Sequence, residues 1–339
     1  MNVTTLGVDL AKSVFQVHGA DAPGRCVFSE QLSRAKLAPF MANVPPCVIG
    51  MEACSGAHYW ARRFQALGHE VRLMNPQFVK AYVKSNKNDR NDAEAACEAV
   101  TRPSMRFVAV KSVAQQDRQA LHRVRERLIG HRTALVNQTR GLLAEYGIVV
   151  GKQIAVLRRR LPEILEDGKN ELTPDARMLF AELYEELLEL DRRITPLSER
   201  IKCEANEDEL CQRLQALEGV GPMIASAATA TVGDARVFRN GRQFAASLGL
   251  VPRQYSTGGK TRLGAISKRG DKYLRKLLIQ GATIDVYHAA HKQTPRARWI
   301  QGLVTRCGKQ KAAVAVANKN ARVIWALMAR GETYRASAN

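Results

Sequence analysis

The sequence lacks the features that would place it in a membrane or in a secretory pathway. It has no apolar run near the roughly 20 residues that a membrane-spanning helix needs. Its first residues, Met1–Thr5, include no basic stretch followed by an apolar one, so we expect no signal peptide. No acylation motif or basic amphipathic anchor stands out. We therefore expect a cytoplasmic protein with no membrane partner.

Paired cysteines are also missing. The seven cysteines are scattered along the chain, and no Cys-x-x-Cys pair occurs. This spacing argues against a zinc knuckle and against a disulfide framework. We expect thiols that stay reduced, as is usual in the cytoplasm.

What the sequence has in excess is positive charge. Its 339 residues carry a formal net charge of +20 at pH 7, and 45% of them are hydrophobic. The hydrophobic share is normal for a folded chain, and the length suits two or three domains. A charge this large favours polyanionic partners. Nucleic acid is therefore the leading candidate partner.

The charge is segregated along the chain. Residues 163–210 hold 15 acidic and six basic side chains, whereas residues 235–276 hold 11 Lys or Arg and one acid, Asp271. Residues 286–331 hold nine Lys or Arg and no acid. We expect the acidic stretch to face protein or solvent, and the basic stretches to line a nucleic-acid channel.

The patterning predicts three regions and a fold class of α/β plus all-α. Residues 1–105 alternate short apolar runs with helical stretches, which is typical of an α/β domain. Residues 106–215 predict long helices, and residues 216–335 predict a mainly helical domain. The strands predicted in the first region are Val3–Val8, Val14–His18, Cys47–Met51 and Glu70–Met74, and its helices are predicted near 35–42, 57–67 and 92–100.

The middle region carries two apolar seams at helical spacing. Leucines recur every seven residues at Leu121, Leu128, Leu135 and Leu142. A second seam, with alternating spacings of four and three, consists of Leu183, Leu187, Leu190, Ile194, Leu197 and Ile201. Such seams are typical of coiled coils. Two interpretations follow: a coiled-coil arm that joins two copies, or a helical hairpin within one chain.

Four carboxylates are candidates for a metal site. Asp9 and Glu52 each follow an apolar strand. Asp89 and Asp92 lie three residues apart at the start of a predicted helix and so share one of its faces. Gathering these charges would be costly without cations. Together they suit two Mg²⁺ ions and phosphodiester chemistry, although Asp92 alone could instead be a helix N-cap.

Two glycine-containing segments are candidates for phosphate binding. Gly219 and Gly221 form a Gly-x-Gly turn before a predicted helix, as in a helix-hairpin-helix, which presents backbone N–H groups to phosphate. Farther on, Ser256 and Thr257 adjoin a Gly-Gly turn. This second segment is a phosphate-binding loop with a possible nucleophile, or a plain solvated turn. The basic residues predicted to bind nucleic acid are Arg253, Lys260, Arg262, Lys268, Arg269, Lys272 and Arg275.

Taken in order, these motifs resemble those of one transposase family. The chain is similar to the DEDD insertion-sequence transposases related to the Piv DNA invertase. This is the insertion-sequence one-ten family, whose members are also called bridge recombinases. The resemblance covers nearly the whole chain. The segments that carry it are Gly7–Lys12, Met51–Ala53, Asp89–Ala93, Gly219–Gly221, Gly249–Lys260 and Ile266–Arg275.

The resemblance implies a fold and a chemistry that composition and spacing do not. It implies a RuvC-like, RNase H-type domain over 1–105, a coiled-coil region over 106–215 and a transposase domain over 216–335. It implies that the four carboxylates hold the metal ions. It further implies a composite site in which a serine of the last domain attacks DNA and forms a phosphoserine link. Ser256 is favoured because a primary hydroxyl is the less hindered nucleophile, and Thr257 is the alternative.

The resemblance also implies partners. Family members use a bridge RNA to choose donor and target DNA, and this sequence shows no helix-turn-helix or zinc finger that would read bases. We therefore expect DNA, a bridge RNA and a homo-oligomer, either dimer or tetramer. Two other functions stay open. One is a RuvC-like nuclease in which metal-activated water cuts the strand without a covalent intermediate, and the other is an inactive nucleic-acid-binding remnant.

Overall fold

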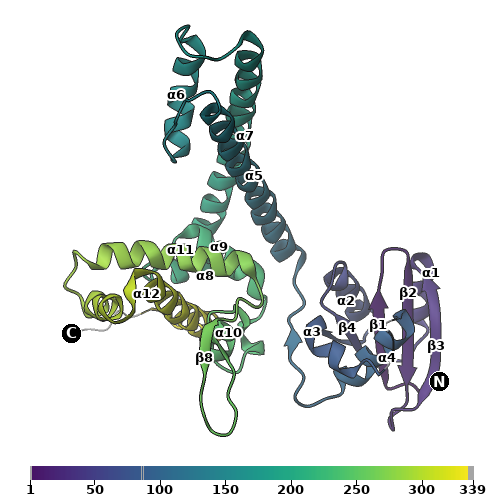
Figure 1. Ribbon diagram of the computed structural model, residues 1–339. Helices are drawn as coiled ribbons and strands as arrows, with labels where there is room; N and C mark the ends of the chain where they lie inside the picture. Colours follow the sequence, from purple (N-terminus) through teal and green to yellow (C-terminus); the bar gives the residue numbers. More distant parts are fainter. Residues whose placement is uncertain (1, 85, 87, 335–339) are drawn as a thin grey trace. The chain divides into compact units, whose positions relative to one another are not determined.

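The computed structural model describes residues 2–84, 86 and 88–334 (Figure 1). Met1 and residue 335, the two outer limits of the predicted regions, lie outside the described residues. The chain divides into two compact units, which are described separately. The first is built mainly from residues 1–115, with 232–243 and 328–330, and the second mainly from residues 116–231 and 244–327. Among the described residues, no helix combines the length and the apolarity needed to cross a bilayer.

A six-stranded mixed sheet forms the centre of the first unit. Its strands, in spatial order, are β3 (Cys26–Ser33), β2 (Val14–Ala20), β1 (Thr5–Leu10), β4 (Val48–Glu52), β5 (Glu70–Met74) and β6 (Phe107–Val108). Strand β1 pairs antiparallel with β2 and parallel with β4, and β4 pairs parallel with β5. The carboxyl ends of β1 and β4 therefore lie at the same edge of the sheet.

Helices cover both faces of this sheet. Because successive residues of a strand point to opposite faces, Leu6 and Ile49 join one core cluster with side chains of α1 (Arg34–Ala42) and α2 (Ala57–Ala66). The next residues, Gly7 and Gly50, contact α4 (Asp89–Val100) instead. Helix α3 (Pro76–Val79) and the 3₁₀ turn η1 (Lys80–Tyr82) precede α4 in the chain. The predicted α/β character of this region is confirmed.

A long helical hairpin begins the second unit. It consists of α5 (Val113–Ala144), α6 (Ile154–Glu166) and α7 (Pro174–Glu207), and α5 and α7 run side by side with α6 near one end (Figure 1). The two seams meet, because Leu128 and Leu135 share one buried cluster with Leu187 and Leu190. The seams therefore pack against each other within one chain, as the intramolecular interpretation predicted. A role for the hairpin in joining two copies stays a prediction.

The first seam shifts by one residue near its end. Leu121, Leu128 and Leu135 are buried, but Leu142 is 44% exposed and its neighbour Leu143 is fully buried. A straight helix has 3.6 residues per turn, so a strict seven-residue repeat drifts by about 20° per heptad. After three heptads from Leu121, the drift has turned Leu142 away from the core, and the next residue, Leu143, faces the core instead.

Short and long helices follow α7, together with a small hairpin, and most of them belong to the second unit, whereas residues 232–243 are grouped with the first. The elements after α7 are α8 (Glu209–Gln215), α9 (Pro222–Val232), the 3₁₀ turn η2 (Ala235–Val237), α10 (Gly241–Ser247), β7 (Pro252–Gln254), β8 (Leu263–Ile266), α11 (Lys272–Ala289) and α12 (Pro295–Arg330). Helix α12 is interrupted at Gly308, whose φ of 79° is not helical. The mainly helical character of this region is confirmed, and the β7–β8 hairpin is an element that the sequence pattern did not predict.

Candidate catalytic and nucleic-acid-binding sites

Asp9 and Glu52 lie where two neighbouring parallel strands end. Val8 of β1 is paired with Met51 of β4, and the next residue of each strand is a carboxylate. Both carboxylates are half-buried. Burial raises the pKa of the Cys54 thiol, and the negative charges of Glu52 and Asp9 raise it further. The negative charges of both carboxylates thus act on the same thiol, that of Cys54, beside the ends of the strands.

Two glycines allow α4 to lie unusually close to these strands. A Cβ atom on Gly7 would lie 2.0 Å from the carbonyl oxygen of Ala93 and 2.4 Å from the amide nitrogen of Cys97. On the paired position of β4, a Cβ atom on Gly50 would lie 2.7 Å from the carbonyl oxygen of Ala96. No other residue type fits such a contact without displacing the helix backbone. The glycines therefore set the position of α4 on the sheet.

The first turn of α4 carries the other two predicted metal ligands. Asn88 is the N-cap, and its Oδ1 accepts a hydrogen bond of 2.8 Å from the amide of Asn91. Asp89 is exposed, whereas Asp92 is half-buried. The N-cap interpretation of Asp92 is wrong, because Asn88 already occupies that position. Carboxylates in a first turn are stabilised by the helix dipole, so the helix itself tolerates both acids there.

The four carboxylates have the donor chemistry that a hard cation requires. Mg²⁺ prefers carboxylate oxygens, and all four side chains supply them. Within residues 2–84, 86 and 88–334, however, no three His, Cys, Asp or Glu side chains are grouped closely enough to hold an ion. The structure thus brings Asp9 and Glu52 to one edge of the sheet and places the first turn of α4 against β1 and β4. It does not close the four carboxylates into one ligand set.

The serine loop forms the tip of the β7–β8 hairpin. Ser256 is exposed, and its Oγ accepts a hydrogen bond of 2.9 Å from Nε2 of Gln254. The amide of Tyr255 donates to the carbonyl of Arg262 at 2.9 Å, so the two arms stay paired up to Ser256. Ser256 is therefore held at the end of the paired arm and is exposed.

Thr257 begins the turn itself. Its carbonyl accepts a hydrogen bond of 3.0 Å from the amide of Lys260. The two residues between them, Gly258 and Gly259, both have positive φ, 54° and 77°. This is the pattern of a type I′ hairpin turn, which glycine adopts without strain. The Gly-Gly pair is thus explained by the turn, and Ser256 and Thr257 are presented side by side on it.

The predicted nucleic-acid-binding cations differ in exposure. Six of them are exposed, namely Arg253, Lys260, Arg262, Lys268, Arg269 and Lys272. Arg275 is 8% exposed. Its Nη1 donates to the carbonyl of Leu248 at 2.8 Å and to that of Arg269 at 2.7 Å. The prediction that Arg275 binds nucleic acid is therefore corrected: its guanidinium is buried and donates to the protein's own backbone.

The Gly-x-Gly turn before α9 is packed on one side and open on the other. Gly219 has a φ of 79°, and a Cβ atom on Gly281 of α11 would lie 2.1 Å from its carbonyl oxygen. A Cβ atom on Gly221 would meet nothing within 4 Å. The positive φ thus favours glycine at position 219 and the close contact requires it at position 281, whereas Gly221 faces a cleft. The other residues that line this cleft include the cations Arg125, Lys202 and Lys276.

A buried polar network holds the packed side of this turn. Arg296 donates from Nη2 to Oδ1 of Asn320 at 2.9 Å and to the carbonyl of Glu218 at 3.2 Å. It also pairs with the buried carboxylate of Asp285. Isolated charges this deep in the protein would be unfavourable, so the network stabilises the turn only as a complete set. Sequence patterning missed these residues because their partners are distant in the chain.

A second buried polar group in this unit also escaped the sequence pattern. Nδ1 of His122 lies 2.9 Å from the hydroxyl of Tyr273, and Nε2 lies 3.0 Å from Oγ of Ser226. Burial, together with the positive charges of Arg125 and Arg118, lowers the pKa of His122 to about 4. The imidazole is therefore neutral at pH 7 and joins three helices of the core.

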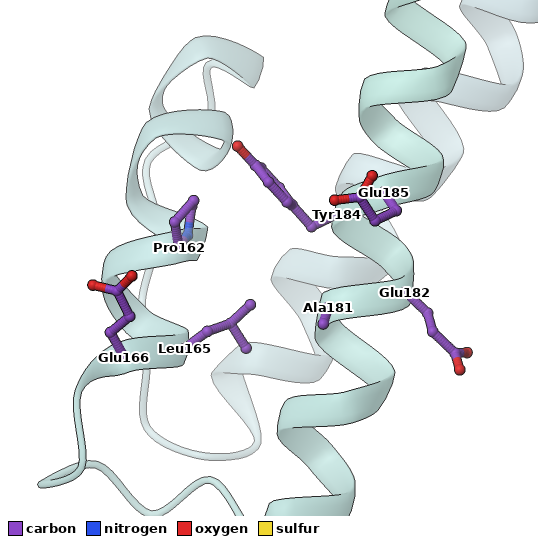
Figure 2. A pocket seen from close by; sticks show the side chains of 7 residues that line it. All are labelled: Pro162, Leu165, Glu166, Ala181, Glu182, Tyr184 and Glu185. Carbon is purple, nitrogen blue, oxygen red and sulfur yellow. The ribbon is translucent and has the colours of Figure 1, made fainter.

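The acidic end of the helical hairpin is unsuited to phosphate. A shallow groove between α6 and α7 is lined by Pro162, Leu165, Glu166, Ala181, Glu182, Tyr184 and Glu185. Figure 2 shows Leu165 directed towards Ala181, and Glu166 and Glu182 directed away from the gap between the helices. Its lining residues include three carboxylates and no cation. This groove is compatible with the prediction that the acidic stretch faces protein or solvent.

Comparison with known proteins gives a consistent result across the chain. Residues 6–148 match a family described as "Transposase" and labelled for DEDD transposases of the IS110 type, and residues 211–298 match the one described as "Transposase IS116/IS110/IS902 family". A "Probable family 20 transposase" of Pseudomonas aeruginosa is 52% identical over 336 residues, which cover 99% of each chain.

Two further relatives are named for insertion sequences. The "Transposase for insertion sequence element IS1111A" of Coxiella burnetii is 46% identical, over 99% of this chain and 93% of the relative. The "Transposase for insertion sequence element IS1328" of Yersinia enterocolitica is 42% identical, over 98% of this chain and 99% of the relative. These identities extend over both units, so the resemblance to insertion-sequence transposases is confirmed. The chain belongs to the IS116/IS110/IS902 family of transposases.

Proposed function

We propose that this protein cuts and rejoins the DNA strands of an insertion sequence, with carboxylates of the first unit and the hydroxyl of Ser256 in the second. The observation that carries the proposal is the close contact of α4 with Gly7 and Gly50, which brings an acidic helix start to two strands that each carry a carboxylate at or next to their last residue. The relatives named for insertion sequences support the same substrate class.

The carboxylates are the residues that would hold divalent metal ions. Asp9 and Glu52 would bind from the strand ends, and Asp89 and Asp92 from the first turn of α4. Two bound Mg²⁺ ions would stabilise the charge on the attacking and leaving oxygens of a phosphodiester. The protein's part is to keep the carboxylates in place, and the glycines under α4 do this through packing. A RuvC-like, RNase H-type domain is supported by the mixed sheet with helices on both faces.

Ser256 is the proposed nucleophile. Its Oγ would bond to phosphorus while the bond from phosphorus to the leaving strand oxygen breaks. The hydroxyl proton would pass to water, and the leaving oxygen would take up a proton. The reverse step, with a hydroxyl of another strand, would release Ser256 and rejoin the DNA. Its exposed position on the hairpin supports this role, as do nearby exposed cations, which would stabilise charge on the phosphate.

The proposed partners are DNA and a structured bridge RNA, bound by a dimer or tetramer of this chain. The proposal of an RNA partner rests on the family resemblance and on basic stretches in a sequence that shows no helix-turn-helix or zinc finger for recognising bases. Three functional regions are proposed: 1–105 for metal binding, 106–215 for assembly, and 216–335 for the nucleophile and nucleic-acid contacts.

Purification from cells that carry the native flanking DNA, followed by sequencing of the RNA that stays bound at about 0.5 M salt, tests whether the protein binds a bridge RNA. Recovery of random cellular RNA together with accurate recombination by RNA-free protein would defeat it.

A trapping assay tests the reaction itself. Labelled donor DNA is incubated with the protein and Mg²⁺, and the mixture is denatured and separated by gel electrophoresis. A label that stays with the protein is expected, because the phosphoserine link survives denaturation. Cleaved DNA without any protein-bound label would instead favour the hydrolytic nuclease, and uncut DNA would favour the inactive remnant.

A further inference from the structure

Arg275 lies in the first turn of α11, the helix that follows the hairpin carrying Ser256 in the chain. Its side chain is buried, and one guanidinium nitrogen donates to two carbonyls at 2.8 Å and 2.7 Å. These carbonyls belong to Leu248, which precedes β7, and to Arg269, which follows β8. One side chain therefore connects the two chain segments that enter and leave the hairpin.

The backbone around these carbonyls is packed with little free space. The amide of Ser267 donates to the carbonyl of Val251 at 2.8 Å, and the amide of Lys268 donates to that of Gly249 at 3.2 Å. A Cβ atom on Gly249 would lie 2.4 Å from the amide nitrogen of Arg269. The two segments are thus in direct backbone contact, and a guanidinium on their inner side holds them together.

Lys268 shows that this contact constrains the backbone. It is the one non-glycine residue among those described with positive φ, at 54°. A side chain in the left-handed region is unfavourable unless the surroundings enforce it. The next glycine, Gly270, has a φ of 71°, and a Cβ atom there would lie 1.8 Å from the carbonyl oxygen of Ser247. The segment that follows β8 is therefore held in an unfavourable conformation against the segment that precedes β7.

The rest of the hairpin has no comparable anchor. Residues 252–265 are all exposed, and the hairpin projects from its own unit (Figure 1). Ser256 lies four residues beyond the start of β7, which is roughly 13 Å at 3.3 Å per residue. A rotation of about 5° at the base would therefore move the hydroxyl by about 1 Å, and a displacement of that size can lower a reaction rate by about 10²-fold.

We infer that Arg275 is a positioning residue for Ser256: it fixes the base of the β7–β8 hairpin and thereby the place of the hydroxyl. The inference rests on the proposed nucleophile. The contact of Arg275 with both segments, here called the brace, does not depend on it. Arginine suits this role because its planar group donates in several fixed directions, whereas a lysine ammonium is a point charge with freely rotating donors. The Arg275→Lys change therefore keeps the positive charge and removes the fixed donor directions of the guanidinium.

Two variants distinguish a brace from a phosphate contact. Arg275→Lys changes the buried residue, and Lys272→Ala removes an exposed cation from the same first turn. Hydrogen exchange is followed in peptides that cover residues 249–270, DNA affinity is measured as a function of salt, and the rate of adduct formation is measured at saturating DNA. Arg275→Gln is the second variant if the melting temperature of Arg275→Lys shows that it does not fold.

The inference predicts opposite results for the two positions. In Arg275→Lys, the backbone amides of residues 249–270 should exchange about tenfold faster, and those of α7 should exchange at the wild-type rate. The variant should form the adduct about 10²-fold more slowly and keep the wild-type dependence of DNA affinity on salt. Lys272→Ala should exchange like the wild type and lower the salt slope by about 0.9, as expected for one lost phosphate contact. An Arg275→Lys protein with a lower salt slope and unchanged exchange would overturn the brace.

The proposed function fails separately. If the wild-type protein forms no adduct that depends on Ser256, the nucleophile is wrong, and the role of Arg275 in positioning it is overturned as well. The exchange measurement still decides whether Arg275 braces the hairpin. If the adduct forms normally in Arg275→Lys while exchange in 249–270 is faster, the brace exists but does not position the nucleophile, and the inference is again overturned.

Discussion

The carboxylates and the serine of this transposase are held in place by contrasting structural means. Asp9 and Glu52 end two central strands, and a helix lies so close to these strands that only glycine fits beneath it. Ser256 lies on an exposed hairpin whose position depends on its base, where Arg275 contacts both entering segments. The proposed metal site thus takes its precision from packing, whereas the proposed nucleophile takes its precision from a few polar contacts at the base of its hairpin.

This difference suits the proposed chemistry. Carboxylates that bind cations must be rigid, because the geometry around Mg²⁺ is strict. A nucleophile that attacks one strand and later releases it must reach DNA and allow exchange of strands, so an exposed hairpin with a firm base is appropriate. The two regions should therefore respond differently to mutation, and the following predictions test that difference.

The largest effect is expected when a carboxylate loses its charge. Asp9→Asn or Asp92→Asn should reduce strand cleavage below detection, since the loss of a ligand removes several kcal/mol of transition-state stabilisation. DNA binding should change little. The control is Asp21→Asn, which alters an acid in the turn between β2 and β3. Full cleavage by both site variants with Mg²⁺ as the only divalent ion would contradict the metal assignment.

The next effect concerns the glycine contact under α4. Gly7→Ala should destabilise the first unit by about 3 kcal/mol, at the upper end for overpacking, because its Cβ atom would lie 2.0 Å from a backbone oxygen. It should also abolish cleavage by moving α4. Gly141→Ala in α5 is the matched control, since a Cβ atom there meets nothing within 4 Å and alanine favours a helix. Thermal unfolding measures both, and equal stability of the two variants would exclude the packing argument.

Acid should weaken the second unit through His122. Its pKa is lowered to about 4 by burial, while the unfolded value is near 6.5. The unfolded chain therefore binds more protons between these values, and stability is complete above pH 6.5 and falls as the pH drops towards 4, by about 3 kcal/mol. Urea unfolding at pH 7 and pH 4.5 should show this loss in the wild type and a smaller loss in His122→Gln. The same pH dependence in both proteins would refute the assignment.

The smallest effect is expected for single exposed cations of the hairpin. Arg253→Ala should lower the slope of log affinity against log salt by about 0.9, which corresponds to one phosphate contact. Arg193→Ala removes another exposed arginine, from the acidic stretch of α7, and should leave the slope unchanged. Equal slopes for these two variants would mean that the hairpin does not contact the DNA backbone.

The sequence predicted the buried parts of this fold better than its edges. Glu70–Met74 is a strand with the predicted limits, because its apolar residues are buried in the core clusters on the faces of the sheet. Strand β3 was missed, since it is an edge strand with exposed, polar positions. The β7–β8 hairpin was missed because its strands are short and exposed, so no hydrophobic alternation marks them.

The candidate sites were predictable only where chemistry depends on residue type. Carboxylates after apolar strands can be found in a sequence, and so can a serine beside a Gly-Gly turn. The reason why residue 7 is glycine cannot be found in the sequence, because it depends on how closely α4 approaches β1. Arg275 was misassigned because a basic stretch does not reveal which of its cations is buried. Tertiary contacts decide these cases, and local patterns do not record them.

The most direct test of the account is to identify the residue that becomes attached to DNA. The trapped adduct is digested with a nuclease and a protease, and mass spectrometry locates the remaining nucleotide. The account predicts a nucleotide on Ser256, lost in Ser256→Ala and retained in Thr257→Ala. A nucleotide on Thr257 or Tyr255, or one that persists in Ser256→Ala, would contradict it.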